Sequence, residues 1–178
     1  MKSALNFAAA LLVLLTFAGC ASSGGVVRNT SPISTSRPVS LDFIFVETSS
    51  SLSDLESEKR LLNDSIVTGL KETGFFRNVS GNKADVNSGG GINIRVELKE
   101  IHKVSDNARL WMGALAGQAR IVVRVTVTDL NSGNQIETFE AEGESGKSAQ
   151  AGTTNEAIQR AAEQVVAEID EIRSRTAQ

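Results

Sequence analysis

The residue types that most often carry enzyme chemistry are scarce in this chain of 178 residues. It contains one cysteine, one histidine and one tryptophan, and it has no tyrosine. A catalytic histidine needs a nucleophile and an orienting partner, and a metal site needs several nitrogen, sulfur or carboxylate ligands. The sequence offers no such set around His102, where we expect a surface or sheet-edge histidine. We therefore predict a non-catalytic protein without metal or cofactor, and an uncharacterised enzyme is the less favoured alternative.

An excess of positive charge is also missing. The chain has 18 lysines and arginines against 21 aspartates and glutamates, which gives a formal net charge of −3. Nucleic-acid binding depends on clustered basic residues that neutralise phosphates, so we do not expect a nucleic-acid partner. The hydrophobic fraction of 40% is ordinary for a globular domain.

The first twenty residues predict a lipid anchor. Lys2 is followed by an apolar run over residues 4–19, which is short for a transmembrane helix but typical of a secretory signal peptide. The run ends in Phe17-Ala18-Gly19-Cys20, which resembles the lipobox of bacterial lipoproteins, with Phe17 in place of the usual leucine. The resemblance implies that residues 1–19 are removed and that acyl groups such as palmitate on Cys20 enter the lipid bilayer. An ordinary signal peptide and a retained apolar anchor are the alternatives.

The residue after Cys20 bears on the destination of the protein. In such lipoproteins an aspartate at this position marks retention in the inner membrane, and here the residue is Ala21. The resemblance therefore implies an outer-membrane lipoprotein whose domain faces the periplasm. The inner membrane and the cell surface stay open as alternatives.

Residues 20–40 are predicted to be the acylated cysteine and a flexible tether. Serine, threonine and glycine dominate this stretch, and both prolines of the chain, Pro32 and Pro38, lie in it. Such a composition cannot bury a core. No proline follows Pro38, so residues 41–178 are predicted to form a single domain.

The first part of that domain alternates between strand and helix patterns. Residues 41–47 predict a strand. Ser53 to Glu56 fits a capping box, and a helix with an apolar stripe is expected from there to about Thr73. Gly74 is expected to close the helix in a left-handed conformation, with Phe75 returning to the core. Residues 75–80 predict a short strand.

The second part is dominated by alternating patterns. Residues 92–99 predict a strand, and the change of phase at Glu100-Ile101 predicts a bulge. Residues 119–129 and 135–142 predict a hairpin around the Asp129–Gly133 turn. A second capping box at Thr153 to Glu156 predicts a helix to about Arg173, with a Glu156–Arg160 ion pair.

This order of elements, β-α-β-β-β-β-α, predicts an α+β fold. Each long strand has one apolar face, and the two helices supply matching apolar stripes. We therefore expect a mostly antiparallel sheet of about five strands with both helices packed on one face, which is a two-layer sandwich. The opposite face is expected to be wet or to meet a partner; it carries Arg95, Glu97, Lys99, Arg120, Arg124 and Thr126.

Two loops imitate ligand sites but lack the context that those sites need. The stretch from Ala141 to Ser148 fits a relaxed phosphate-loop pattern, yet no later strand could supply an acidic magnesium ligand. The Asp129 loop resembles a calcium loop, yet Asn134 stands where the sharp turn needs glycine. We read both stretches as parts of a hairpin and its exit.

One connection is unusually apolar. Residues 110–117 contain the only tryptophan and join two predicted strands, although connections are generally polar. The segment either folds down as a core plug, or it forms an exposed contact for a partner or the bilayer through Trp111, Met112 and Leu115.

The run from Gly117 to Gly133, then Gly143 and the closing alanine-rich helix, resembles the bacterial lipoproteins grouped as domain of unknown function 4410. The similarity covers about residues 41–173, and the family carries no assigned catalytic residues. The order of elements is also similar to the periplasmic domain of curli-secretion lipoproteins, an analogy of fold that does not transfer function. We expect a membrane-anchored, non-catalytic binding or assembly module with an envelope protein partner. The alternative is a subunit of a ring-shaped secretion or envelope complex, and the sequence leaves the oligomeric state open.

Overall fold

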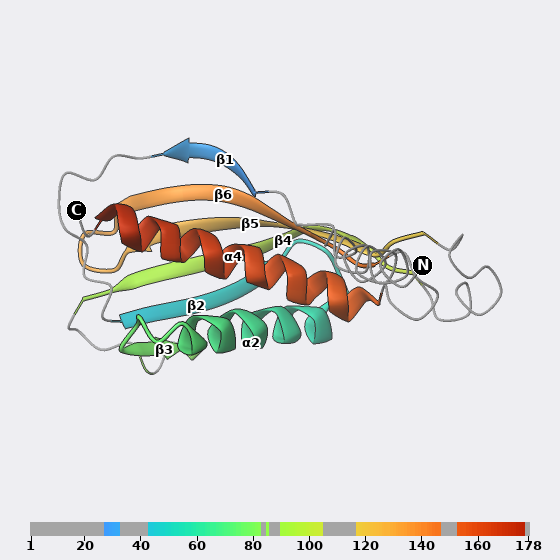
Figure 1. Cartoon of the computed structure of the whole chain (residues 1–178), viewed down its shortest axis with the longest axis horizontal. Coiled ribbons are helices and arrows are strands. Elements are labelled where there is room, and N and C mark those ends of the chain that lie inside the picture. Colours follow the sequence, from blue (N-terminus) through green and yellow to red (C-terminus); the bar gives the residue numbers. More distant parts are fainter. Residues whose placement is uncertain are drawn as a thin grey trace, which may run out of the picture.

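The structure is a computed structural model, and it describes residues 27–32, 43–82, 85, 90–104, 117–146 and 153–176, with the backbone alone for 27–32. Figure 1 shows a curved sheet with two long helices lying across it. The elements in chain order are β1 (Val27–Pro32), β2 (Phe43–Ser50), α2 (Glu56–Glu72), β3 (Asn78–Ser80), β4 (Ile92–His102), β5 (Arg120–Asp129), β6 (Gln135–Glu144) and α4 (Thr154–Thr176).

The strands form one mixed sheet in the order β1-β6-β5-β4-β2-β3. The pairs β1–β6, β6–β5 and β5–β4 are antiparallel, whereas β4–β2 and β2–β3 are parallel. The parallel part arises because α2 carries the chain back between β2 and β3, as a crossover connection must. The predicted α+β class, the predicted order from β2 onward and the mostly antiparallel sheet are confirmed.

Strand β1 corrects the prediction of a flexible tether over residues 20–40. Val27 to Pro32 instead pair with β6 at the edge of the sheet, from Val27 opposite Ala141 to Pro32 opposite Glu137. The segment is rich in polar residues, so hydrophobic alternation gave no indication of a strand. Pairing at a sheet edge needs only backbone donors and acceptors, which any residue except proline supplies in full.

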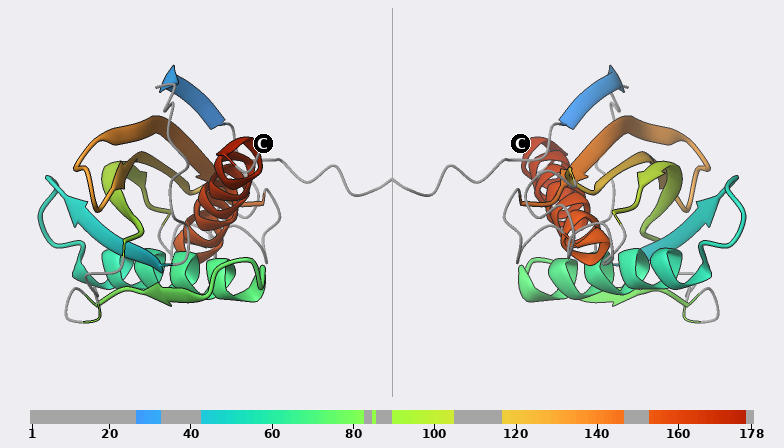
Figure 2. Two further views of the ribbon diagram at one scale, coloured as in Figure 1. Left: turned by 90° about the vertical axis from the view of Figure 1, so that its left-hand side faces the viewer. Right: turned by 90° about the vertical axis from the view of Figure 1, so that its right-hand side faces the viewer.

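Both helices lie on the same face of the sheet (Figure 2). Helix α4 packs on β5 and β6, α2 packs on β2 and β3, and the two helices also contact each other. The two helices run in the same direction. Gly69 of α2 lies against Val166 of α4, and Phe75, just after α2, lies against Arg173 near the end of α4. The layer between sheet and helices holds the core, which includes Ile44, Leu62, Ile94, Val125, Phe139 and Ile158. Within the described ranges, no helix combines the length and the apolar character needed to cross a bilayer.

The start of α2 differs from the predicted capping box. The helix begins at Glu56 with Leu55 as the N-cap residue, and no side chain caps it. Asp54 has a φ of 58°, which turns the chain sharply before the helix. Leu55 is buried, so packing of this leucine in the core holds the start of the helix in place of a side-chain cap.

The end of α2 confirms the role of Gly74 and corrects that of Phe75. Gly74 has a φ of 70°, the left-handed conformation expected of a closing glycine. Phe75 is 58% exposed, and Phe76 enters the core in its place. The Phe75 ring lies under the Arg173 guanidinium, 4.1 Å from the ring centroid, so a cation–π contact holds it outside the core.

The predicted details of the central strands are confirmed. The β4–β5 register shifts between Leu98 and Glu100, where the bulge was expected. The hairpin turn is closed by a hydrogen bond from the Gly133 amide to the Asp129 carbonyl at 2.9 Å. Helix α4 begins with the Glu156 amide donating to Thr153 Oγ1 at 3.1 Å, and Arg160 pairs with Glu156 at 3.0 Å.

Candidate interaction surface

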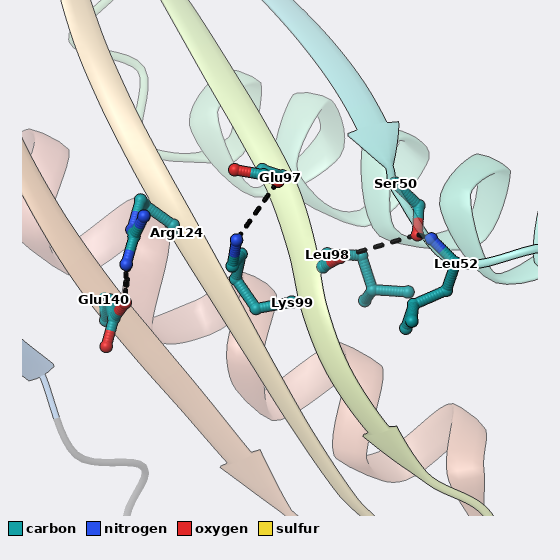
Figure 3. Close-up of polar contacts among 7 residues, drawn as sticks. All are labelled: Ser50, Leu52, Glu97, Leu98, Lys99, Arg124 and Glu140. Carbon is teal, nitrogen blue, oxygen red and sulfur yellow. Dashed lines mark hydrogen bonds and ion pairs between the residues drawn. The ribbon is translucent and has the colours of Figure 1, made fainter.

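The face of the sheet opposite α2 and α4 carries acidic and basic side chains from neighbouring strands. Buried residues of β4 and β5 point toward the helices, so their neighbours in sequence point away from them. Figure 3 looks onto this open face, with the helices behind the strands. The open face comprises Glu47, Asn93, Arg95, Glu97, Lys99, Glu100, Arg120, Arg124, Thr126, Glu140, Glu142 and Glu144.

Two arginines of β5 reach glutamates of β6. Arg124 Nη2 lies 2.8 Å from Glu140 Oε1, across a directly paired position of the two strands (Figure 3). Arg120 donates two hydrogen bonds to the Glu142 carboxylate, one from Nε to Oε1 and one from Nη2 to Oε2 at 2.8 Å. That hydrogen bond raises the pKa of Arg120 above its already high value, and the charges of Glu142 and Glu100 add to the effect. Arg120 therefore remains charged at any physiological pH.

The other half of the open face repeats this arrangement. Arg95 Nε lies 2.7 Å from Glu47 Oε1 on the neighbouring strand, and the Asn93 amide donates to the same oxygen at 3.0 Å. On β4 itself, Lys99 Nζ lies 3.3 Å from Glu97. Exposed pairs of this kind contribute only about 0–1 kcal/mol each, so the open face does little for stability. Its fixed pattern of charges is better suited to orienting a partner.

Two polar links tie the strand ends to their surroundings. At the end of β2, the Ser50 hydroxyl donates to the Leu98 carbonyl at 3.4 Å and accepts from the Leu52 amide at 3.0 Å (Figure 3). After β4, Lys103 pairs with Glu58 of α2. This hydrogen bond lowers the pKa of Glu58 despite its partial burial. The charged end of β4 is thereby fixed to the helical layer.

Two grooves lie outside the open face. A groove of about 670 Å³ runs between α2 and α4, and it is lined mostly by small or acidic side chains, including Ser65, Gly69, Glu72, Ala162, Glu163 and Asp170. A smaller one of about 300 Å³ lies between β2 and the first half of α2.

Among the described residues, no group of three or more histidines, cysteines, aspartates or glutamates could hold a metal ion.

The residues singled out from the sequence fall into two groups. Cys20, Trp111, Met112 and Leu115 lie outside the described residues, so both interpretations of residues 110–117 stay predictions. His102 is exposed at the end of β4. The Asp129 carboxylate accepts hydrogen bonds from the amides of Asn131 at 2.7 Å and Ser132 at 3.3 Å, so it stabilises the turn.

One cluster was missed by the sequence analysis. Glu137 and Glu168 are buried beside Arg175, on the side of the sheet that the helices cover. A signal was available in the spacing of β6, because Ile136 is out of phase with Phe139 and Ala141. An odd-numbered apolar spacing in a strand indicates a bulge, and a bulge can turn a polar side chain inward.

Comparison with known proteins identifies the family of this chain. Residues 23–170 match the family described as domain of unknown function DUF4410. The chain belongs to the DUF4410 family. The comparison with curated proteins yields no match.

Solved structures show the same fold. A PelC dodecamer from Paraburkholderia phytofirmans has 14% sequence identity and a TM-score of 0.51, with 80% of this chain and 95% of that chain covered. Protein XCC0632 from Xanthomonas campestris, of the DUF330 family, has 13% identity and a TM-score of 0.53, with coverage of 87% and 97%. At these identities the likeness shows a shared fold alone.

Proposed function

We propose that this DUF4410 protein is a non-catalytic, membrane-anchored lipoprotein of the cell envelope that acts as one subunit of a ring of identical copies. The observation that carries the proposal is the open face, on which charges of both signs stand at fixed positions and neither α2 nor α4 covers them. PelC, which shares the fold, forms a dodecamer. A ring of identical copies is therefore compatible with this architecture.

A ring requires each copy to present two different surfaces. Contacts between unlike surfaces repeat head to tail, and they close into a ring when the rotation allows it. In this chain the open face of one copy would contact a different surface of the next copy. Pairs such as Arg124–Glu140 would fix the register of that contact, since charged groups at an interface contribute mainly to orientation and specificity.

The lipid anchor supports the same role. Each buried CH₂ group of an acyl chain contributes about 0.8 kcal/mol to membrane binding, so two or three chains on Cys20 would hold the domain firmly at the bilayer. Anchoring confines the copies to one surface and raises their effective concentration, which favours assembly. The absence of aspartate at position 21 supports the outer membrane, with the domain on the periplasmic side.

We expect the substitution Arg124→Glu to weaken the assembly. It places a carboxylate directly opposite Glu140 and reverses one charge at the centre of the open face. The domain should still fold, because an exposed pair contributes little to stability. Light scattering on the full chain in detergent should show a shift toward smaller species, about tenfold in the midpoint concentration of assembly for a loss of ~1.4 kcal/mol.

The matched control is Arg77→Glu, which makes the same change of charge at an exposed position between α2 and β3. This variant should assemble like the wild type. Equal losses of assembly in both variants would indicate a general effect of net charge, and an unaffected Arg124→Glu variant would remove the open face from the interface.

The proposed location gives a separate prediction. Ala21→Asp should move the mature protein to the inner membrane in a Gram-negative host that sorts lipoproteins by this residue. The measurement is density-gradient separation of the two membranes, with Ala21→Ser as the control that keeps a small residue. An unchanged distribution of the Ala21→Asp protein would count against outer-membrane sorting through this position.

A further inference from the structure

An inward-facing glutamate lies on the helix-covered side of the sheet. The β5–β6 register shifts between Val127 and Thr128, so Ile136 and Glu137 are both buried although they are neighbours in sequence. The Glu137 side chain is only 4% exposed. Carboxylates are rarely buried this deeply unless they are paired, so Glu137 needs a partner in the helical layer.

Arg175 forms ion pairs with both Glu137 and a second buried glutamate, Glu168. Arg175 Nη2, in the last turn of α4, lies 2.9 Å from Glu137 Oε2 and 3.4 Å from Glu168 Oε1. The Glu168 side chain is 9% exposed. The other oxygen of Glu137, Oε1, is buried and has no hydrogen-bond partner among the described residues. The cluster therefore has two buried carboxylates, one guanidinium and one buried oxygen that lacks a donor.

The balance of charge in this cluster favours the uptake of a proton. Two ionised carboxylates beside one arginine leave an excess negative charge among the described residues of the cluster, and buried acids relieve such a charge by binding a proton. Burial raises the pKa of Glu168, and the charges of Glu171 on α4 and Glu137 on β6 raise it further. Arg175 acts in the opposite direction without cancelling these effects.

We propose that Glu168 takes up a proton beside the Glu137–Arg175 pair, and that this proton strengthens the attachment of the C-terminal part of α4 to the start of β6. With the proton on Glu168, one of the two negative charges beside Arg175 is removed. Both carboxylates approach the same nitrogen of Arg175, so protonation of Glu168 leaves the guanidinium to Glu137. When the proton leaves, two anions compete for one guanidinium and the end of the helix is held less firmly.

The sign of the pH dependence follows from the direction of the shift. A carboxyl group whose pKa is higher in the folded state than in the unfolded state stabilises the fold at low pH. That contribution is lost as the pH rises through the raised pKa of Glu168. Loss of this proton therefore weakens the attachment of α4 as the solution becomes more alkaline. It does not depend on the proposed ring.

The test compares thermal unfolding of the full chain in detergent from about pH 4.5 to about pH 8. The Glu168 contribution to the wild-type Tm should be lost toward the alkaline end. Glu168→Gln, which keeps this position neutral at every pH, should remove this part of the slope and melt about 3 °C above the wild type at the alkaline end. Glu163→Gln, an exposed change on the same helix, should keep the wild-type slope.

Infrared spectroscopy supplies a second readout that does not depend on stability. A buried protonated carboxyl group gives a carbonyl band distinct from that of a carboxylate, and in the wild type we expect this band to persist at pH values where exposed carboxyl groups are already ionised. It should vanish in Glu168→Gln. In Glu137→Gln its loss should move to lower pH, because the charge of Glu137 no longer raises the pKa of Glu168. Absence of the band from the wild type, or equal destabilisation of Glu168→Gln at every pH, would overturn the proposal.

Discussion

Cys20→Ser should abolish acylation completely and leave an uncut precursor. The lipobox resemblance assigns the cysteine sulfur as the atom that receives the diacylglyceryl group, and a serine hydroxyl does not replace a thiolate as nucleophile in this reaction. Signal peptidase II acts after that transfer, so cleavage should fail as well. Labelling with radioactive palmitate, followed by gel electrophoresis, measures both effects: loss of the label and a band of higher mass than the mature protein.

A displaced cysteine provides the control for this experiment. In the double variant Cys20→Ser with Ser22→Cys, the chain again has one thiol, two positions later. We expect no palmitate on this variant, because the residue three positions before the cysteine is then Gly19, whereas the natural sequence has the large apolar Phe17 there. Palmitate on the Cys20→Ser protein would disprove the assignment of the anchor.

Gly143→Ala should destabilise the domain by about 3 kcal/mol, which lowers the Tm by roughly 10 °C for a domain of this size. A Cβ atom on Gly143 would lie 2.0 Å from the Ala157 carbonyl oxygen and 2.5 Å from the Ala161 nitrogen. Both are backbone atoms of α4, so no side-chain rotation can relieve the clash. The helix must move away from β6, and the packing between the two elements loosens with it.

A second glycine makes a matched control. A Cβ atom on Gly69 would lie 2.9 Å from Val166 Cγ2, which is a side-chain atom that can rotate. Alanine is also favoured over glycine inside a helix by roughly 0.5–1 kcal/mol, which offsets the cost of moving the valine. We therefore expect Gly69→Ala to melt close to the wild type. Thermal melts that do not separate the two variants would contradict the close packing of α4 on β6.

The sequence predicts the long helices and strands because the residues that they bury recur at regular intervals along the chain. Ile92, Ile94 and Val96 alternate with polar residues, since one side of β4 faces the core and the other faces solvent. Strand β1 has no such record, because it is held at the sheet edge by backbone pairing. Phe75 and Phe76 are adjacent apolar residues, and the pattern cannot decide which one enters the core; the position of Arg173 decides it.

The candidate site is predictable in part for the same reason. The polar phase of β4 and β5 identifies Arg95, Arg120 and Arg124 as residues of the open face. Their partners depend on the register between strands, which places Glu140 opposite Arg124 and follows from the hairpin turn and the bulges. The Glu137–Glu168–Arg175 cluster depends on where α4 ends over β6, and no local pattern contains that information.

The most direct test of the central claim is native mass spectrometry of the full-length protein extracted from envelopes in mild detergent. The account predicts one dominant assembly whose mass is a fixed integer multiple of the acylated subunit and does not change on dilution, as expected for a closed ring. Copies of Arg124→Glu measured in the same way should give smaller species. A wild-type protein that is monomeric at every concentration would contradict the assignment of this chain as a ring subunit.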